Sequence, residues 1–154
     1  MLTQELIFLQ REEKTSFEFL SNISDKLLSM GYIKESFKKA ILKREEIFPT
    51  GIGTENYSIA IPHTDSEHII KPGIAFVRFN NKCAFKEMCT NNDLDVTMAF
   101  VLLVKAKEEQ AVLLSKLMGL FTDNELLDKL NSENDCETIA VSYTHLTLPT
   151  TPYV

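Results

Sequence analysis

The stretch from Asp95 to Val104 constrains the fold more than any other part of the chain. It ends in the letters AFVLLV, an apolar run that no polar residue interrupts. A strand without a polar face has to be covered on both sides, as strands in the middle of α/β sheets are. The stretch therefore predicts a central strand of a sheet that is covered by other elements.

The segment behind Thr15 predicts an amphipathic helix. Thr15 and Glu18 have the spacing of a capping box, in which each residue accepts a hydrogen bond from the other's backbone N–H. Gly31 stands where such a helix would end. Between these signals, apolar residues recur at helical intervals: Phe17, Leu20, Ile23, Leu27 and Leu28.

A second helix is predicted from Lys34 to about Glu46. Pro49 and Gly51 follow it and break the helical pattern. The segment from Pro49 to Tyr57 is expected to be a loop, because its Gly and Asn residues tolerate unusual backbone angles. The expected apolar side of this helix consists of Phe37, Ala40, Ile41 and Ile47.

Strands and helices are both predicted in the rest of the chain. The further strands are expected at Leu6–Leu9, at Ser58–Ile61, which Pro62 ends, and at Gly73–Phe79. The further helices are expected from Glu109 to about Leu120, behind the capping-box pair Thr122 and Glu125, and from Asp135 to Ala140. Strands interleaved with helices predict an α/β fold, a mixed β-sheet sandwiched by helices in a single domain.

Composition agrees with one globular domain and excludes several classes of function. The chain has 154 residues, 44% of them hydrophobic, and its three cysteines show no spacing typical of a metal site or a disulfide framework. The net charge of −6 without a Lys and Arg cluster argues against nucleic-acid binding. No apolar stretch reaches the ~18 residues of a spanning helix, and no signal peptide is evident, so a cytoplasmic location is expected.

The last stretch, from about 141 to 154, does not continue the pattern of the domain. Its letters VSYTHLTLPT resemble the translation of an adapter used in sequencing libraries, and they show no helical periodicity. We therefore expect residues 1–140 to form the domain and residues 141–154 to be a non-native tail, the alternative being a genuine disordered terminus. His145, which lies in this stretch, takes no part in the functional interpretation.

His63 is the strongest candidate for a functional side chain. It follows Pro62 directly behind a predicted strand, in the position where α/β sheets present reactive groups on loops. From the residues alone, three interpretations stay open: an ordinary surface histidine, a nucleophile, or a metal ligand. The metal alternative rests on His63, Asp65 and His68, which are zinc-type ligands within one short segment.

The segment from Lys43 to Asp65, KREEIFPTGIGTENYSIAIPHTD, favours the nucleophile. It resembles the signature of the mannitol/fructose class of IIA domains of bacterial sugar phosphotransferase systems (PTS EIIA type 2). Arg44 and Glu45 match the Arg-acidic pair at the end of a helix, Thr50–Gly53 match the TG(I/L)G-like loop, and Ile59–His63 match the IAIPH strand that ends in the phosphorylated histidine.

The resemblance extends from about Leu6 to Ala140. The FPTG form, the PHTD continuation and the AFKEM segment are most similar to the galactitol-type branch of the class. Many mannitol and fructose members have a second active-site histidine where this chain has Gln110. A glutamine can hydrogen-bond to a phosphoryl oxygen but cannot carry a proton or a charge.

The resemblance implies a chemistry for these residues. His63 would take the phosphoryl group, and attack by its Nε2 atom is implied. Arg44 would stabilise the charge on the phosphoryl oxygens, although a KREE segment at a helix end is otherwise typical of a solvated charged face. Thr64 and the glycine-rich loop would add hydrogen-bond donors, and Asp65 and Glu45 would orient His63 or Arg44.

The resemblance also implies partners. The small carrier protein HPr would donate the phosphoryl group, and a cysteine of the cognate IIB component would accept it. The membrane component IIC would be reached only indirectly, and no cofactor is needed.

Two alternative functions remain, a regulatory IIA-like domain that acts by binding a target and a metal-dependent hydrolase. His68 is expected on the rim of the site, where Ile52, Tyr57, Phe79 and Phe85 are further candidates, although core packing is expected for most of these four.

Overall fold

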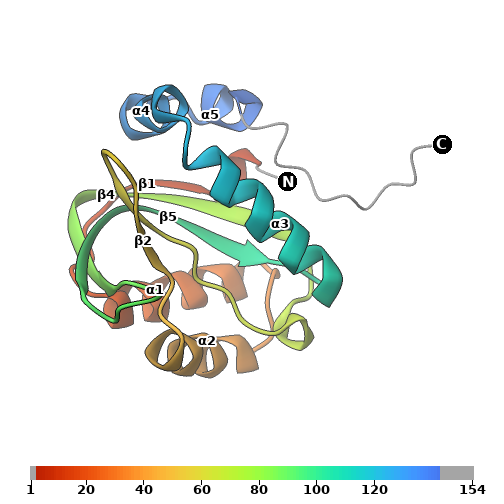
Figure 1. Ribbon diagram of the computed structural model, residues 1–154. Coiled ribbons are helices and arrows are strands. Elements are labelled where there is room, and N and C mark those ends of the chain that lie inside the picture. The colour runs from red at the N-terminus through yellow and green to blue at the C-terminus, as the bar shows by residue number, and fades with distance from the viewer. Residues whose placement is uncertain (1–2, 143–154) are drawn as a thin grey trace.

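A long antiparallel hairpin forms the middle of the sheet in the computed structural model, which describes residues 3–142. Its strands are β4 (Gly73–Lys86) and β5 (Asp93–Leu103). β1 (Ile7–Arg11) pairs in parallel with β4, and β3 (Ser58–Ala60) pairs in parallel with β5. β2 (Gly51–Gly53) adds an antiparallel edge next to β3, so the five strands lie in the order β1-β4-β5-β3-β2 (Figure 1).

Helices cover both faces of this sheet (Figure 1). α1 (Ser16–Ser29) and α2 (Ser36–Ile47) lie on one face, and α3 (Lys107–Leu120), α4 (Asn124–Ser132) and α5 (Cys136–Ser142) lie on the other. Two short 3₁₀ helices, Gln4–Leu6 and Ser66–His68, complete the regular structure. The predicted fold, a mixed sheet between helices in one α/β domain, is confirmed.

β5 is the covered central strand that its sequence predicts. Successive side chains of a strand point to opposite faces. Val101 and Leu103 accordingly belong to the core under α1 and α2, whereas Phe100 and Leu102 belong to the core under α3 and α4. All four side chains are fully buried, so the strand contributes to two separate hydrophobic cores.

α1 begins as its capping signal predicts. Thr15 Oγ1 accepts a hydrogen bond from the backbone N–H of Glu18 at 3.2 Å, and Glu18 Oε1 accepts one from the N–H of Lys14 at 3.2 Å. Gly31 follows the helix with φ of +83°, a left-handed conformation that favours glycine. The capping box is thus present, with the return bond displaced by one residue.

The apolar side expected for α2 is wrong at its end. Ile47 is 55% exposed, whereas Glu45 is only 7% exposed. The buried face of the helix consists of Phe37, Ile41 and Glu45, which are four residues apart. Ile47 lies two residues beyond Glu45, roughly 200° further around the helix, and therefore faces away from the core.

Three other boundaries differ from the expectations. The supposed loop at 49–57 contains β2, whose Gly-rich sequence gives no strand signal. β4 continues past Phe79 to Lys86, because its outer half alternates between buried and exposed residues and pairs with β5. Asp123, and not Thr122, caps α4: its carboxylate accepts the N–H of Leu126, while the Thr122 hydroxyl donates to the carbonyl of Gly119.

The helix expected at 135–140 is α5, which continues to Ser142. The rest of the suspected tail, including His145, lies outside the described residues. No helix in the described part of the chain has the length and apolar character needed to cross a membrane.

Candidate functional site

The segment that presents His63 is held by main-chain hydrogen bonds to its neighbours. β3 ends at Ala60, and Ile61 and Pro62 continue it as buried residues. The N–H of Ile61 donates to the carbonyl of Thr50 at 3.2 Å, and the carbonyl of Pro62 accepts the N–H of Leu102 at 3.0 Å. The main chain directly before His63 is therefore fixed on both of its sides.

The imidazole of His63 has a defined hydrogen bond on one nitrogen. Its Nδ1 lies 2.8 Å from the carbonyl oxygen of Ile61. A carbonyl oxygen only accepts hydrogen bonds, so Nδ1 carries the proton and Nε2 of the neutral ring keeps its lone pair. This tautomer agrees with the attack by Nε2 that the family resemblance implies, and the residues alone do not indicate it.

The surroundings of His63 also favour the neutral ring. Burial lowers its pKa from the usual value, and the nearby positive charge of Arg44 lowers it further, against the opposing influence of the Ile61 carbonyl and the Asp65 carboxylate. A histidine with a lowered pKa is neutral at pH 7, since the ordinary value is already about 6.5. The residue is thus in the protonation state of a nucleophile.

Arg44 lies on the exposed side of α2 and is loosely held. Its guanidinium contacts Asp65 Oδ1 at 3.4 Å and lies 5.4 Å from the centroid of the Phe48 ring. The side chain is 36% exposed and the Asp65 side chain 66% exposed, and ion pairs between such groups contribute about 0 to 1 kcal/mol. The contact is weak enough for an anion to replace Asp65 at the guanidinium.

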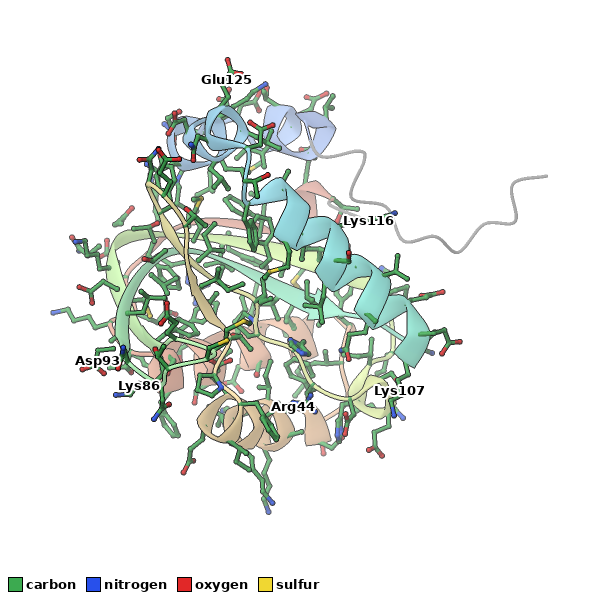
Figure 2. All side chains as sticks on the ribbon, viewed as in Figure 1. Arg44, Lys86, Asp93, Lys107, Lys116 and Glu125 are labelled. Carbon is green, nitrogen blue, oxygen red and sulfur yellow. The ribbon has the colours of Figure 1, made fainter. Side chains whose placement is uncertain are left out.

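Two hollows meet at Arg44 and Asp65. The first, the Arg44–Gln110 hollow, has a volume of about 370 Å³ and is lined by Arg44, Asp65, Ser66, Glu67, Lys107 and Gln110. The second, the Arg44–His68 hollow, has a volume of about 250 Å³ and is lined by Ala40, Lys43, Arg44, Ile47, Phe48, Thr64, Asp65 and His68. Figure 2 shows that Arg44 comes from α2 and Lys107 from the start of α3, which cover opposite faces of the sheet.

Glu45 is turned away from these hollows into the protein. Its Oε2 accepts the backbone N–H of Thr50 and its Oε1 accepts the Thr50 hydroxyl, both at 2.8 Å. Burial raises the pKa of the carboxyl group to about 7, although the two bonds from Thr50 act in the opposite direction. The direct partner of Glu45 is therefore Thr50, whereas Asp65 is the residue that contacts Arg44.

Gln110 contacts the main chain on the other side of His63. Its side-chain N–H donates to the carbonyl oxygen of Thr64 at 3.1 Å. Thr64 itself is only 4% exposed, and it also forms part of the wall of the Arg44–His68 hollow. Gln110 therefore contacts the residue that directly follows the candidate nucleophile.

The three residues of the metal alternative do not come together as a ligand set. His68 Nδ1 lies 2.8 Å from the hydroxyl of Ser36, whereas His63 Nδ1 lies 2.8 Å from the carbonyl oxygen of Ile61 and Asp65 contacts Arg44. In residues 3–142, no group of three His, Cys, Asp or Glu side chains has an arrangement that could hold a metal ion. His68 instead lines the Arg44–His68 hollow.

The aromatic rim candidates belong to the cores. Phe79 and Phe85 are buried and contact Phe19, with ring centroids 5.0 and 6.3 Å apart. Ile52 and Tyr57 are partly buried and pack against the core under α3 and α4. Sequence reasoning missed the exposed Phe48 and Ile47, which line the Arg44–His68 hollow and could have been found from their closeness to Arg44 in the chain.

The comparison with known families decides the identity of the domain. The sequence profile of the family described as "Phosphoenolpyruvate-dependent sugar phosphotransferase system, EIIA 2" matches residues 1–141. The chain belongs to this family. The family resemblance seen in the sequence is thereby confirmed for nearly the whole chain.

Relatives of this IIA domain support the assignment. The galactitol-specific EIIA component of Escherichia coli (strain K12) is 32% identical over 113 residues, which cover 73% of this chain and 75% of that protein. The crystal structure of IIA mannitol from Escherichia coli has a TM-score of 0.73 at 23% identity and covers 95% of this chain and 98% of that one. The complex of enzyme IIAMTL and phosphorylated enzyme IIBMTL from Escherichia coli gives 0.71 at 21% identity, with 95% of this chain and 96% of that one covered. These two structures share the fold of the IIA domain.

Proposed function

We propose that this IIA domain carries a phosphoryl group on Nε2 of His63, between phosphorylated HPr and a cysteine of the cognate IIB component. The observation that carries the proposal is the hydrogen bond between His63 Nδ1 and the Ile61 carbonyl, which leaves the Nε2 lone pair available. The lowered pKa of His63 supports it, because only the neutral ring is a nucleophile.

The transfer needs little from the protein except position and charge. The Nε2 lone pair attacks the phosphorus of the donor phosphohistidine while the donor P–N bond breaks, and the proton stays on Nδ1. In the second step a IIB thiolate attacks the phosphorus, and the Nε2–P bond returns its electron pair to the ring. Negative charge on the three equatorial phosphoryl oxygens is the main demand of both steps.

Arg44 meets that demand in the proposal. Its guanidinium offers planar, permanently charged donors that match phosphoryl oxygens, and its present partner Asp65 holds it only weakly. On phosphorylation the guanidinium would exchange the carboxylate for the phosphoryl group. Asp65 then keeps Arg44 in place before the phosphoryl group arrives, and Gln110 holds the Thr64 carbonyl beside His63.

The partners and the setting follow from the same proposal. The likeness to a galactitol-specific EIIA component supports a galactitol-type system, and a complex of a fold relative with phosphorylated IIB supports the IIB partner. The transported sugar would meet only IIC, which the domain reaches indirectly through IIB. The domain would work in the cytoplasm without a cofactor, and we take it to end with α5, so that residues 143–154 contribute nothing.

Reconstitution tests the proposal. The domain is incubated with labelled phosphoenolpyruvate, enzyme I and HPr, and then with the cognate IIB. We expect acid-labile, base-stable label on the wild-type domain, no label on His63→Ala, and full label on the matched variant His68→Gln. Label that persists in a folded His63→Ala variant would overturn the proposal, whereas acceptance without onward transfer to IIB would favour the regulatory alternative.

A further inference from the structure

We propose that Glu45 is a positioning residue for His63, which fixes the tautomer of the imidazole through a buried chain of hydrogen bonds. The consequence for phosphoryl transfer rests on the function proposed above. The effect on the ring itself does not, because the tautomer is a property of the unphosphorylated protein. None of the bonds in this chain involves the exposed pair of Arg44 and Asp65.

The chain of hydrogen bonds can be followed atom by atom. Glu45 Oε2 accepts the N–H of Thr50 at 2.8 Å, and the carbonyl of Thr50 accepts the N–H of Ile61 at 3.2 Å. The carbonyl of Ile61 in turn lies 2.8 Å from Nδ1 of His63. The bond from the Thr50 hydroxyl to Glu45 Oε1, also 2.8 Å, fixes the carboxylate at the start of this chain.

The location of the carboxyl group argues for a role beyond packing. Glu45 occupies the third position of the buried face of α2, after Phe37 and Ile41. Burying a carboxyl group costs free energy, and burial indeed raises its pKa to about 7. An aliphatic residue of similar size would avoid this cost. The carboxyl group accepts hydrogen bonds from both donors of Thr50, its N–H and its hydroxyl, and a leucine could accept neither.

The segment that Glu45 holds leads directly into β2, where the carbonyl of Gly51 accepts the N–H of Met88 at 2.9 Å. β2 and β3 are joined through only three residue pairs, Gly51 with Ala60, Ile52 with Ile59 and Gly53 with Ser58. Gly51 lies tightly against β4, because a Cβ atom there would come within 2.5 Å of the Lys86 carbonyl oxygen. A shift of Thr50 therefore cannot be absorbed at Gly51 and is passed to Ile61, whose carbonyl determines which imidazole nitrogen carries the proton.

Two substitutions separate hydrogen bonding from packing. Glu45→Leu keeps an aliphatic side chain of similar size but removes both acceptors, which leaves the buried N–H of Thr50 without this partner. Glu45→Gln keeps one acceptor for that N–H, and its NH₂ can donate to the Thr50 hydroxyl. Glu46→Leu, the same change at the exposed neighbouring residue, is the matched control.

The ring tautomer is the direct measurement. Nitrogen-15 shifts of the His63 ring, recorded on the unphosphorylated domain, should show protonated Nδ1 in the wild type, in Glu45→Gln and in Glu46→Leu. We expect a mixture of tautomers in Glu45→Leu. If Glu45→Leu does not fold, Glu45→Asp replaces it, because a carboxylate one methylene shorter cannot reach both donors of Thr50. Unchanged His63 ring shifts in a folded Leu or Asp variant would overturn the proposal and make Glu45 a structural residue.

Transfer kinetics provide the second measurement and separate the two proposals. Misplacement of a reacting group by about 1 Å can cost up to roughly 100-fold in rate. Glu45→Leu should lose rate within that range while its KM for phosphorylated HPr stays unchanged, and Glu45→Gln should recover the rate. A wild-type domain that takes no phosphate on His63, with the tautomers as predicted, would contradict the proposed function alone. Normal transfer by Glu45→Leu would contradict the inference about Glu45 alone.

Discussion

Arg44 and Glu45 are neighbours in the chain, yet they lie in opposite environments. Arg44 is 36% exposed and contacts a mostly exposed Asp65 at 3.4 Å. Glu45 is 7% exposed and accepts two hydrogen bonds of 2.8 Å from Thr50. The difference fits the two tasks that we propose for the pair: a charge that exchanges partners on phosphorylation is held loosely, and a group that positions His63 is held firmly.

The helix makes this division possible. Consecutive residues of an α-helix lie about 100° apart around its axis, so one can face the core while the next faces solvent. Glu45 shares its face with Phe37 and Ile41, and Arg44 reaches the two hollows. The acidic and basic residues of this pair are thus not partners of each other in the described structure.

The largest expected effect concerns the buried member of the pair. The pKa of Glu45 is raised from 4.5 to about 7, so the folded state binds a proton that the unfolded state has lost between these pH values. The stability that this proton provides is present at low pH and is lost as the pH rises through about 7. Relative to the wild type, Glu45→Gln should therefore gain on the order of 2 to 3 kcal/mol in unfolding free energy between pH 5 and pH 8.

Urea unfolding at both pH values measures this difference. Glu46→Gln serves as the control, since its carboxyl group is exposed. If Glu45→Gln and Glu46→Gln respond to pH in the same way, Glu45 is not buried in solution, and the contrast with Arg44 disappears.

The next effect concerns the exposed member. Arg44→Lys keeps the charge but loses the planar fork of donors, and we expect phosphoryl acceptance from HPr to fall roughly 10- to 100-fold. The melting temperature should change by no more than about 1 to 2 °C, because the ion pair with Asp65 is exposed and weak. Lys39→Arg, on an exposed position of the same helix, is the control. A large loss of stability with normal transfer would make Arg44 a structural residue.

Asp65→Asn should have a smaller effect, on the pKa of His63. The Asp65 carboxylate acts to raise that pKa, so its removal should lower the value further. The chemical shifts of the His63 ring during a pH titration measure the change, and Glu67→Gln is the control. An upward shift in Asp65→Asn would mean that the charge balance around His63 is wrong.

The smallest effect is expected for the end of the chain. A protein that stops at Ser142, the last residue of α5, should melt within about 1 °C of the full chain and accept phosphate equally well. The matched comparison is a protein that stops at Glu133, before α5, which would lose the buried side chain of Ile139 and should be clearly less stable. Equal losses in both shortened proteins would show that residues 143–154 belong to the domain.

The sequence was sufficient for the architecture because its strongest signals are long and periodic. The AFVLLV run indicated the covered strand, and Thr15 indicated the start of α1. β2 was not predicted, because a three-residue Gly-Ile-Gly strand has no hydrophobic pattern of its own and depends on pairing with β3. Ile47 was misplaced because hydrophobicity alone does not show that a carboxyl group has taken the buried position.

The candidate site was predictable in its residue types but not in its contacts. The IAIPH and KREE segments indicated His63 and Arg44, and nothing in them indicates that Glu45 meets Thr50 or that His63 Nδ1 meets Ile61. The contact of Glu45 with Thr50 depends on how the end of α2 lies against the start of β2. The contact of His63 with Ile61 is local, between residues two apart, and depends on the side-chain conformation of His63, which the letters of the segment do not encode.

In the proposed function, Nε2 of His63 carries the phosphoryl group while Nδ1 keeps its proton. Phosphorus–nitrogen coupling tests it directly, in the phosphorylated domain with nitrogen-15 in its histidine rings. We expect a coupling from phosphorus to Nε2 of His63 and a protonated Nδ1 in the same ring. A coupling to Nδ1, or to the ring of His68, would contradict it.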